Sequence, residues 1–319
     1  MKARNAGVII FVCIIFAALA VAVMSFSGSP AGGRGIRARI SGSDYIACVY
    51  VRGVIEESNR DYNQDWLLRT VGRLRDDKRN LGILLVIDSP GGAVYQADEA
   101  YLALRDYAES GKALRAYLGP IAASGGYYGA CAAERITANR NTLTGSIGVI
   151  SGRSIDLTGL MSRYGIKVTT ITSGKNKNML NFDSPLTEEQ RSVMQSIADE
   201  CYGRFVTIVA RSRLMSEEEV KVRSDGRVYT AKQALNLGLV DSIDSLEGAA
   251  EKFTAELGSD RYGKKIDVVD FDFKPPRPLM DFLTGRSRPQ IPELELLRLA
   301  PQASFPAYLY TGPGAMPDR

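Results

Sequence analysis

The sequence predicts an α/β fold in which parallel β-strands alternate with α-helices. Short apolar runs that are typical of buried strands alternate with segments of helical periodicity. Two glycine-rich stretches, 87–92 and 122–128, each follow a predicted strand directly. Because ligands of such folds bind at the carboxyl ends of the strands, these stretches mark the expected site. The 319 residues are 45% hydrophobic and 24% charged, an ordinary globular composition with room for a sizeable core.

The N-terminus predicts a membrane anchor. Residues 7–24 are uncharged and apolar, and at 1.5 Å per residue they would span roughly 27 Å as a helix. The following Ser25–Gly28 is a poor cleavage site, so we expect an uncleaved transmembrane helix within residues 1–26. Lys2 and Arg4 precede the span, which predicts a cell-membrane protein with a cytoplasmic N-terminus and an extracytoplasmic catalytic domain. Residues 27–43 are Gly/Ser/Arg-rich and predict a flexible linker.

The main domain is predicted to cover residues 44–258. Its first half is expected to contain four strands and two helices. The strands are predicted at 46–51, 81–87, 113–118 and 135–138, and the helices around 67–74 and 97–108.

In the second half, we expect a helix over 155–164 with Gly165 as its C-cap, then a strand over 166–172 with alternating β-branched residues. A capping box at Thr187 and Gln190 begins a long helix, and a second box at Thr230 begins a shorter helix. An apolar stripe on the long helix indicates a core or oligomer face; it comprises Val193, Ile197, Cys201, Phe205 and Ile208. Residues 259–319 are rich in proline and predict an extended C-terminal arm. We expect this arm to pack on another surface, such as that of a neighbouring subunit.

The two glycine-rich stretches together predict a serine nucleophile beside an oxyanion hole. A strand that breaks into Pro-Gly-Gly before a helix presents unpaired backbone N–H groups. Ser124 lies between small residues that leave room for a substrate carbonyl, and Gly125 offers the N–H group of the following residue. The alternative is structural, because Pro-Gly-Gly is also a common turn and Ser-Gly-Gly a common loop.

The chain contains no histidine, which excludes Ser-His-Asp triads, Cys-His dyads and His-ligated zinc. If Ser124 is a nucleophile, its base must be another group, and the established substitute is a neutral lysine. The loop after residue 172 offers two, Lys175 and Lys177, and the spacing alone does not choose between them. Four cysteines without C-x-x-C spacing predict neither a disulfide framework nor a metal site, and no cofactor is expected. A net charge of +4 is too small to indicate nucleic-acid binding.

Over residues 44–255 the sequence resembles the signal peptide peptidase A family of membrane-anchored serine proteases. The resemblance is carried by IDSPGG at 87–92, ASGGYY at 123–128, TGSIGV at 144–149, SGKNK at 173–177, and DGRVYT at 225–230 with GLVD at 238–241. It implies a ClpP/crotonase-like fold of repeated β-β-α units. Further, it implies a Ser/Lys dyad of Ser124 and Lys177, the latter being the second lysine of an S-G-x-x-K pattern.

The same resemblance implies that Ser146 orients the lysine and that Gly91 or Gly92, with Gly125, donates to the oxyanion. One departure is that the link from Lys177 to Ser184 is longer than usual in the family. The expected reaction is hydrolysis of membrane-associated peptides such as residual signal peptides, in a ring-shaped homo-oligomer. Two alternatives are a crotonase-like acyl-CoA enzyme and a catalytically silent membrane scaffold, and the scaffold would be expected to lack Ser124 or Lys177.

Overall fold

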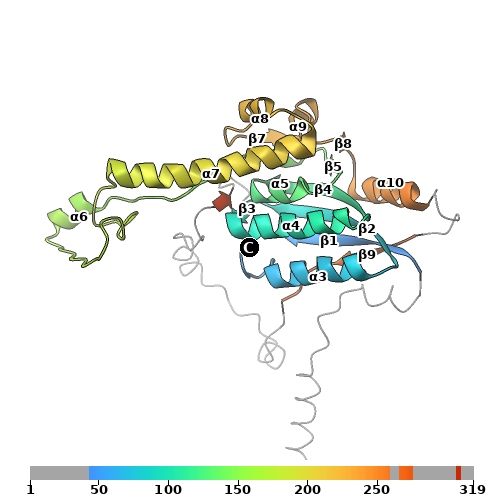
Figure 1. The fold of residues 1–319 in the computed structure, drawn as a ribbon, viewed down its shortest axis with the longest axis horizontal. Helices are drawn as coiled ribbons and strands as arrows, with labels where there is room; N and C mark the ends of the chain where they lie inside the picture. Colours follow the sequence, from blue (N-terminus) through green and yellow to red (C-terminus); the bar gives the residue numbers. More distant parts are fainter. Residues whose placement is uncertain (1–42, 259–265, 276–306, 310–319) are drawn as a thin grey trace, which may run out of the picture.

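The computed structural model describes residues 43–258, 266–275 and 307–309, which form a mixed α/β fold (Figure 1). A mostly parallel eight-stranded sheet has the order β7-β6-β4-β2-β1-β9, with β5 and β8 branching from β4. Its strands are β1 Tyr45–Arg52, β2 Asn80–Ser89, β4 Ala113–Ala123, β5 Arg135–Ala138, β6 Leu143–Gly145, β7 Val228–Thr230, β8 Ser242–Ile243 and β9 Asp267–Phe271. A second, two-stranded sheet pairs β3 Gly91–Ala93 with β10 Ala307–Leu309 in antiparallel orientation.

Helices cover both faces of the large sheet. Strand β2 is buried on both sides: Ile83 and Ile87 belong to the main core, while Leu84 belongs to a smaller core. The main core includes residues of α3 Gln64–Asp76, α4 Val94–Glu109 and α5 Gly125–Ala130. The smaller core includes Phe253 of α10 Leu246–Gly258 on the opposite face. The prediction of an α/β fold with parallel strands is therefore confirmed.

The remaining helices are α6 Thr158–Arg163, α7 Glu188–Arg213, α8 Glu217–Arg223 and α9 Ala231–Asn236. The predicted capping boxes at Thr187 and Thr230 both form, at the first residues of α7 and α9. The stripe on α7 is divided: Phe205 and Ile208 are buried in the core, whereas Ile197 is exposed. Only the C-terminal half of α7 thus contributes to the core.

We define the arm as residues 150–187, which connect the sheet to α7 and extend away from the body in Figure 1. The predicted helix over 155–164 is shorter, since only α6 forms, and none of its residues is buried. The predicted strand over 166–172 is wrong: these residues are irregular and exposed. A strand needs a neighbour for its backbone N–H and C=O groups, and no described strand lies beside this segment.

Strand β9 falls within the predicted C-terminal arm, and it pairs in parallel with β1 of the same chain from Tyr45↔Asp267 to Val49↔Phe271. This part of the predicted C-terminal arm, which is not the arm of residues 150–187, therefore packs on the chain's own sheet.

The localisation predicted from the sequence needs correction. In the part of the chain that the structure describes, no helix combines the length and the apolar composition required to cross a membrane. Helix α7 is long enough but carries charged residues at both ends, among them Glu188 and Arg213. This finding contradicts the predicted single-pass membrane topology. The expected span at residues 7–24, and the linker at 27–43, lie outside the described residues except for Ser43.

Candidate active site

Ser124 occupies a strained turn between a strand and a helix. It follows the last residue of β4 and precedes the first residue of α5, with φ 53° and ψ −118°. A non-glycine residue rarely adopts such a conformation, and strained strand-to-helix turns are one way in which proteins present a serine nucleophile. The side chain is 1% exposed, and its Oγ makes no hydrogen bond to any described residue. A buried hydroxyl without a partner costs free energy, so it points to a role other than stability.

Strand β6 holds this turn from one side. The Ser124 N–H donates to the Gly145 carbonyl at 2.8 Å, and Ala123 lies opposite Gly145 in the parallel β4–β6 pair. Ser146 follows Gly145 with φ 50°, and its N–H donates to the Arg227 carbonyl at 2.8 Å. Two buried serines with positive φ therefore follow the ends of adjacent strands. The sheet register thus brings Ser124 and Ser146 into the same part of the molecule.

Strand β3 provides backbone N–H groups beside α5. The Gly91 N–H donates to Ser89 Oγ at 3.1 Å, so this group is already engaged. The Gly91 carbonyl accepts from the Ile55 N–H at 2.9 Å, and the Ala93 N–H donates to the Ile55 carbonyl at 2.8 Å. Neighbouring residues of a strand direct their N–H groups to opposite edges. The Gly92 N–H therefore faces away from Ile55, toward the opposite edge of β3.

Glycine is required at position 92 by this close approach. A Cβ atom there would lie 1.8 Å from the Ile55 carbonyl oxygen. Gly125 is the first residue of α5, and the first N–H groups of a helix have no partner within the helix. The Gly125 N–H thus has no partner within its helix, and the Gly92 N–H faces the edge of β3 at which Tyr308 of β10 lies opposite Gly92, whereas the Gly91 N–H is engaged by Ser89.

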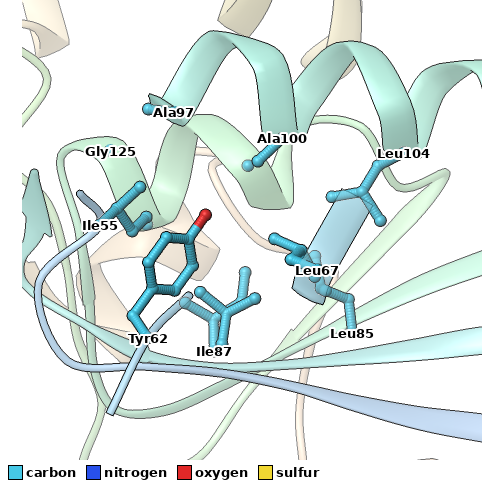
Figure 2. Close-up of a pocket in the computed structure, with 12 residues that line it drawn as sticks. Ile55, Tyr62, Leu67, Leu85, Ile87, Ala97, Ala100, Leu104 and Gly125 are labelled. Atoms are coloured by element: carbon cyan, nitrogen blue, oxygen red, sulfur yellow. The ribbon is translucent and has the colours of Figure 1, made fainter. Parts of the chain in front are cut away.

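A small apolar cavity lies behind the Ser124 turn (Figure 2). Its volume is about 10 Å³, close to the lower limit for one water molecule. Carbon atoms line nearly all of it, so it stays dry; the labelled lining residues are Ile55, Tyr62, Leu67, Leu85, Ile87, Ala97, Ala100, Leu104 and Gly125. Burial raises the pKa of the Tyr62 hydroxyl, which donates to Gln64 Oε1. The cavity is too small for a substrate side chain and forms a rigid support for the turn.

The two candidate lysines differ in their partners. Lys175 Nζ forms an ion pair with Glu189 at 2.7 Å, and this contact lowers the pKa of the Glu189 carboxyl. The Lys175 amine is therefore engaged by a carboxylate of the same chain. The Lys177 side chain is exposed and makes no hydrogen bond or ion pair with the described residues; its backbone N–H donates to the Gly174 carbonyl. Of the two, Lys177 is therefore the lysine that remains available.

Lys177 and Ser124 are not brought together within one chain. Lys177 lies in the arm, between α6 and α7, and α6 is far from α5 in Figure 1. The burial of Ser124 and the exposure of Lys177 are consistent with this separation.

Two residues that hold the site were given no role by the sequence. Ser89 lies inside the Ile87–Gly92 stretch, where its hydroxyl orients Gly91. Ile55 supports β3 through two backbone hydrogen bonds, and no pattern around residue 55 signals this, because backbone groups carry no sequence signature. The N–H groups of β3 that face Ile55, and those that face the opposite edge, could be assigned only once Ile55 was known to lie beside the strand.

A strained serine at the start of a helix, beside backbone N–H groups of glycines, is typical of enzymes that transfer acyl groups. The family model described as "Peptidase family S49" matches residues 107–259, a range that contains Ser124, Ser146 and Lys177. The chain is 38% identical over 240 residues to the "Putative protease slr0021" of Synechocystis sp., covering 75% of this chain and 83% of that protein. It is 31% identical over 236 residues to the "Serine protease SPPA, chloroplastic" of Arabidopsis thaliana, covering 74% of this chain but 34% of that protein.

The chain thus belongs to peptidase family S49, the family of signal peptide peptidase A, and is a peptidase. Among solved structures, it resembles a ClpP1 mutant from Listeria monocytogenes at 15% identity and a TM-score of 0.43, over 63% of this chain and 93% of that one.

Proposed function

We propose that the chain is a serine peptidase of ClpP/crotonase-like fold in which Ser124 is the nucleophile and Lys177 the base. The observation that carries this proposal is the buried, unpartnered Ser124 hydroxyl on a strained turn beside the N–H groups of Gly92 and Gly125. Family membership supports peptide hydrolysis as the reaction. The substrates are extended peptides, of which residual signal peptides are the leading class.

The chemistry is acyl transfer. Neutral Lys177 accepts the proton of Ser124 as Oγ bonds to the peptide carbonyl carbon, and the negative oxygen rests on the Gly92 and Gly125 N–H groups. The C–N bond then breaks, with the proton passing from Lys177 to the leaving amine. Water attacks the ester with Lys177 as base again, releasing the carboxylic acid and restoring Ser124. Removing one oxyanion donor typically lowers kcat by about 10²–10³.

Lys177 must come from a second copy of the chain, because its own Ser124 lies elsewhere. The arm offers a surface for this contact: its apolar side chains are exposed, among them Ile155, Leu160, Tyr164, Ile166, Ile171 and Phe182. Exposed apolar residues grouped on one segment are typical of protein interfaces. Packing of this surface on a neighbour would remove water from the Lys177 amine, which favours the neutral form that a base needs. Ser146, adjacent to Ser124, is then placed to accept or donate a hydrogen bond that orients this amine.

Two other functions receive less support. A crotonase-like acyl-CoA enzyme would also use backbone N–H groups, but family membership favours peptide hydrolysis. A silent scaffold would have no reason to keep a strained, unpartnered serine together with Lys177.

The test compares hydrolysis of a signal-peptide-like substrate by wild type, Ser124→Ala, Lys177→Met and Lys175→Met. We expect Ser124→Ala and Lys177→Met to lose activity by about 10³-fold or more, and Lys175→Met to retain it. Labelling by a serine-directed phosphonate should be abolished by Ser124→Ala. An inactive Lys175→Met beside an active Lys177→Met would overturn the choice of base, and labelled Ser124→Ala would overturn the nucleophile.

A further inference from the structure

The segment between α8 and α9 has no role in the proposed reaction, although its DGRVYT stretch at 225–230 is among those that carry the family resemblance. Strand β7 lies in this segment and runs antiparallel to β6, with Val228 opposite Gly145. Gly145 is the last residue of β6, and Ser146 follows it directly. The segment therefore borders the turn that presents Ser146.

The backbone of this turn is held from two sides. The Gly145 carbonyl accepts from the Ser124 N–H at 2.8 Å. The Ser146 N–H donates to the Arg227 carbonyl, also at 2.8 Å. Both residues of the turn have positive φ, 85° at Gly145 and 50° at Ser146. A serine keeps this conformation only where its surroundings determine it, so the contacts around the turn decide where the Ser146 side chain lies.

The position of the Ser146 hydroxyl depends on this backbone alone. The residue is 7% exposed, and its hydroxyl makes no hydrogen bond to any described residue. In the proposed site, the same hydroxyl orients the amine of Lys177. A displacement of the backbone at Ser146 would therefore move the hydroxyl relative to that amine.

The ring of Tyr229 covers the turn. A Cβ atom at Gly145 would lie 2.7 Å from Cδ2 of this ring, so the ring is in contact with the Gly145 backbone. Tyr229 is 8% exposed, and its hydroxyl donates at 2.9 Å to the carbonyl of Arg223, the last residue of α8. Carbonyls in the last turn of a helix lack partners within the helix, so this hydrogen bond ties the ring to α8. Tyr229 thus joins α8 to the turn that presents Ser146.

We propose that Tyr229 is a positioning residue of the active site: its ring fixes the backbone before Ser146 and thereby the place at which the Ser146 hydroxyl meets the Lys177 amine. This inference rests on the proposed function, because it concerns the same serine and the same base. The ring fills the space into which Gly145 would otherwise move. Without it, Ser146 can relax from its positive φ to an ordinary conformation. No step of the reaction passes through Tyr229, since its hydroxyl is engaged by Arg223.

The first experiment compares kcat and KM for a peptide substrate in wild type, Tyr229→Leu, Tyr229→Phe and Tyr202→Phe. The matched control is Tyr202→Phe, because the Tyr202 hydroxyl makes the same kind of bond, to the Ser224 carbonyl at 2.8 Å. We expect Tyr229→Leu to lower kcat by about 10–100-fold at nearly constant KM, since a misplacement of about 1 Å can cost about 10² in rate. Tyr229→Phe keeps the ring and should lose about threefold, through the lost hydrogen bond alone. The control should match wild type within about twofold.

A second comparison asks whether Tyr229 acts through Ser146. The effect of Tyr229→Leu on kcat is measured again in a Ser146→Ala background. Because this background lacks the hydroxyl that Tyr229 positions, the further loss should be less than about twofold. A ring that only stabilises the fold would lower activity by the same factor in both backgrounds.

A third measurement does not depend on catalysis. Amide hydrogen exchange of the Ser146 N–H is followed in a Ser124→Ala background. Exchange should be faster with Tyr229→Leu, because the bond to the Arg227 carbonyl opens more often, and unchanged with Tyr202→Phe. If Tyr229→Leu does not fold, Tyr229→Met replaces it with the same expected results, since its flexible side chain fills part of the same space.

The outcomes separate this inference from the proposed function. The inference is overturned if Tyr229→Leu keeps the wild-type kcat, or if it raises KM at constant kcat. It is also overturned if the loss is the same with and without the Ser146 hydroxyl, or if the Ser146 N–H exchanges equally in all variants. In each of these cases a serine-directed phosphonate still labels Ser124. If the wild-type chain is neither active nor labelled, the proposed function fails and this inference fails with it.

Discussion

Apolar side chains are buried in the body of the molecule, by which we mean the described residues outside the arm, and they are exposed in the arm. In the body, β2 buries a continuous run of apolar residues between two helical layers, and Ser124 is fixed in a strained turn by the strands around it. In the arm, residues of the same type point into solvent: Ile171 is 95% exposed, whereas Ile83 of β2 is 0% exposed. Ser124, the proposed nucleophile, thus lies in the buried part of the chain, and Lys177, the proposed base, lies in the exposed arm.

Helix α7 connects these two regions. Its C-terminal half packs in the core through Phe205 and Val209, and its N-terminal half lies toward the arm. The body end is fixed by Arg213, whose side chain is 6% exposed and contacts Asp241 and the Gly238 carbonyl. A rigid helix of this kind can hold the arm in one direction without any packing of the arm itself. The difference between the regions supports the proposal that a second chain completes the arm.

The largest effect is expected when the two regions are supplied by different chains. Ser124→Ala and Lys177→Met are each inactive, and the two proteins are mixed and allowed to exchange subunits. If each site takes Ser124 from one copy and Lys177 from its neighbour, about a quarter of the sites in an equal mixture regain both residues. Recovery of about a quarter of wild-type hydrolysis supports a shared site. If both residues came from one chain, every site would lack one of them and the mixture would stay inactive.

The next largest effect is expected when a methyl group is added at Gly92, in the body of the molecule. Gly92→Ala places a Cβ atom 1.8 Å from the Ile55 carbonyl oxygen, and backbone atoms cannot yield by small side-chain adjustments. We expect a loss of about 3 kcal/mol or more in the free energy of unfolding, with loss of activity. Gly129→Ala in α5 is the matched control, because no atom beyond its chain neighbours and its own helix backbone lies within 4 Å of its Cβ position, and alanine favours a helix by up to about 1 kcal/mol. Urea denaturation measures both, and equal stabilities would contradict the role assigned to Ile55.

Much of the body could be predicted from the sequence because its signals are local. Apolar runs and capping boxes predicted β1, β2, β4 and α7, and the glycine-rich stretches predicted the position of Ser124. The end of β4 was placed five residues too early: the strand continues to Ala123 through Gly119 and Pro120, which break the apolar pattern that marks its first half.

The conformation of the arm could not be predicted from the sequence, because its patterns give regular structure only where another segment packs beside them. β-branched alternation over residues 166–172 predicts a strand, but a strand forms only beside another strand. The spacing alone left Lys175 and Lys177 open, and the family resemblance implied Lys177; the contact of Lys175 with Glu189 is a further difference that no spacing reveals. The pairing of β10 with β3 joins residues so distant in the chain that a local pattern cannot report it.

A smaller effect is expected at the anchor of α7. Asp241 is partly buried, which raises its pKa, but hydrogen bonds from Arg213 and the Ile136 N–H outweigh this and hold the pKa below the ordinary 3.8. A carboxyl with a lowered pKa stabilises the folded state above its ordinary pKa, and this stabilisation is lost as the pH falls through the lower folded-state value. We expect Asp241→Asn to lower the free energy of unfolding by about 2 kcal/mol at neutral pH, since the Asp241 side chain is 28% exposed.

The difference between wild type and Asp241→Asn should be constant above about pH 5 and shrink below pH 3.8. Chemical denaturation across this range measures it. Asp225→Asn provides a control, because the Asp225–Arg227 ion pair is on the surface and should contribute little. A difference that grows as the pH falls would contradict the linkage.

The smallest effect on stability is expected at Ile171 in the arm, and its contrast with the same substitution at Ile83 in the body tests the difference between the regions. Ile83→Ala removes buried carbon atoms from β2 and should lower the free energy of unfolding by about 2–5 kcal/mol. Ile171→Ala removes atoms already in water in the isolated chain and should change it by no more than about 0.5 kcal/mol at low protein concentration. If the arm packs on a neighbouring copy, Ile171→Ala should instead weaken subunit association, measured by sedimentation, and lower hydrolysis in proportion. A loss of stability at Ile171 that does not depend on protein concentration would mean that the arm packs on its own chain, and the contrast between the two regions would disappear.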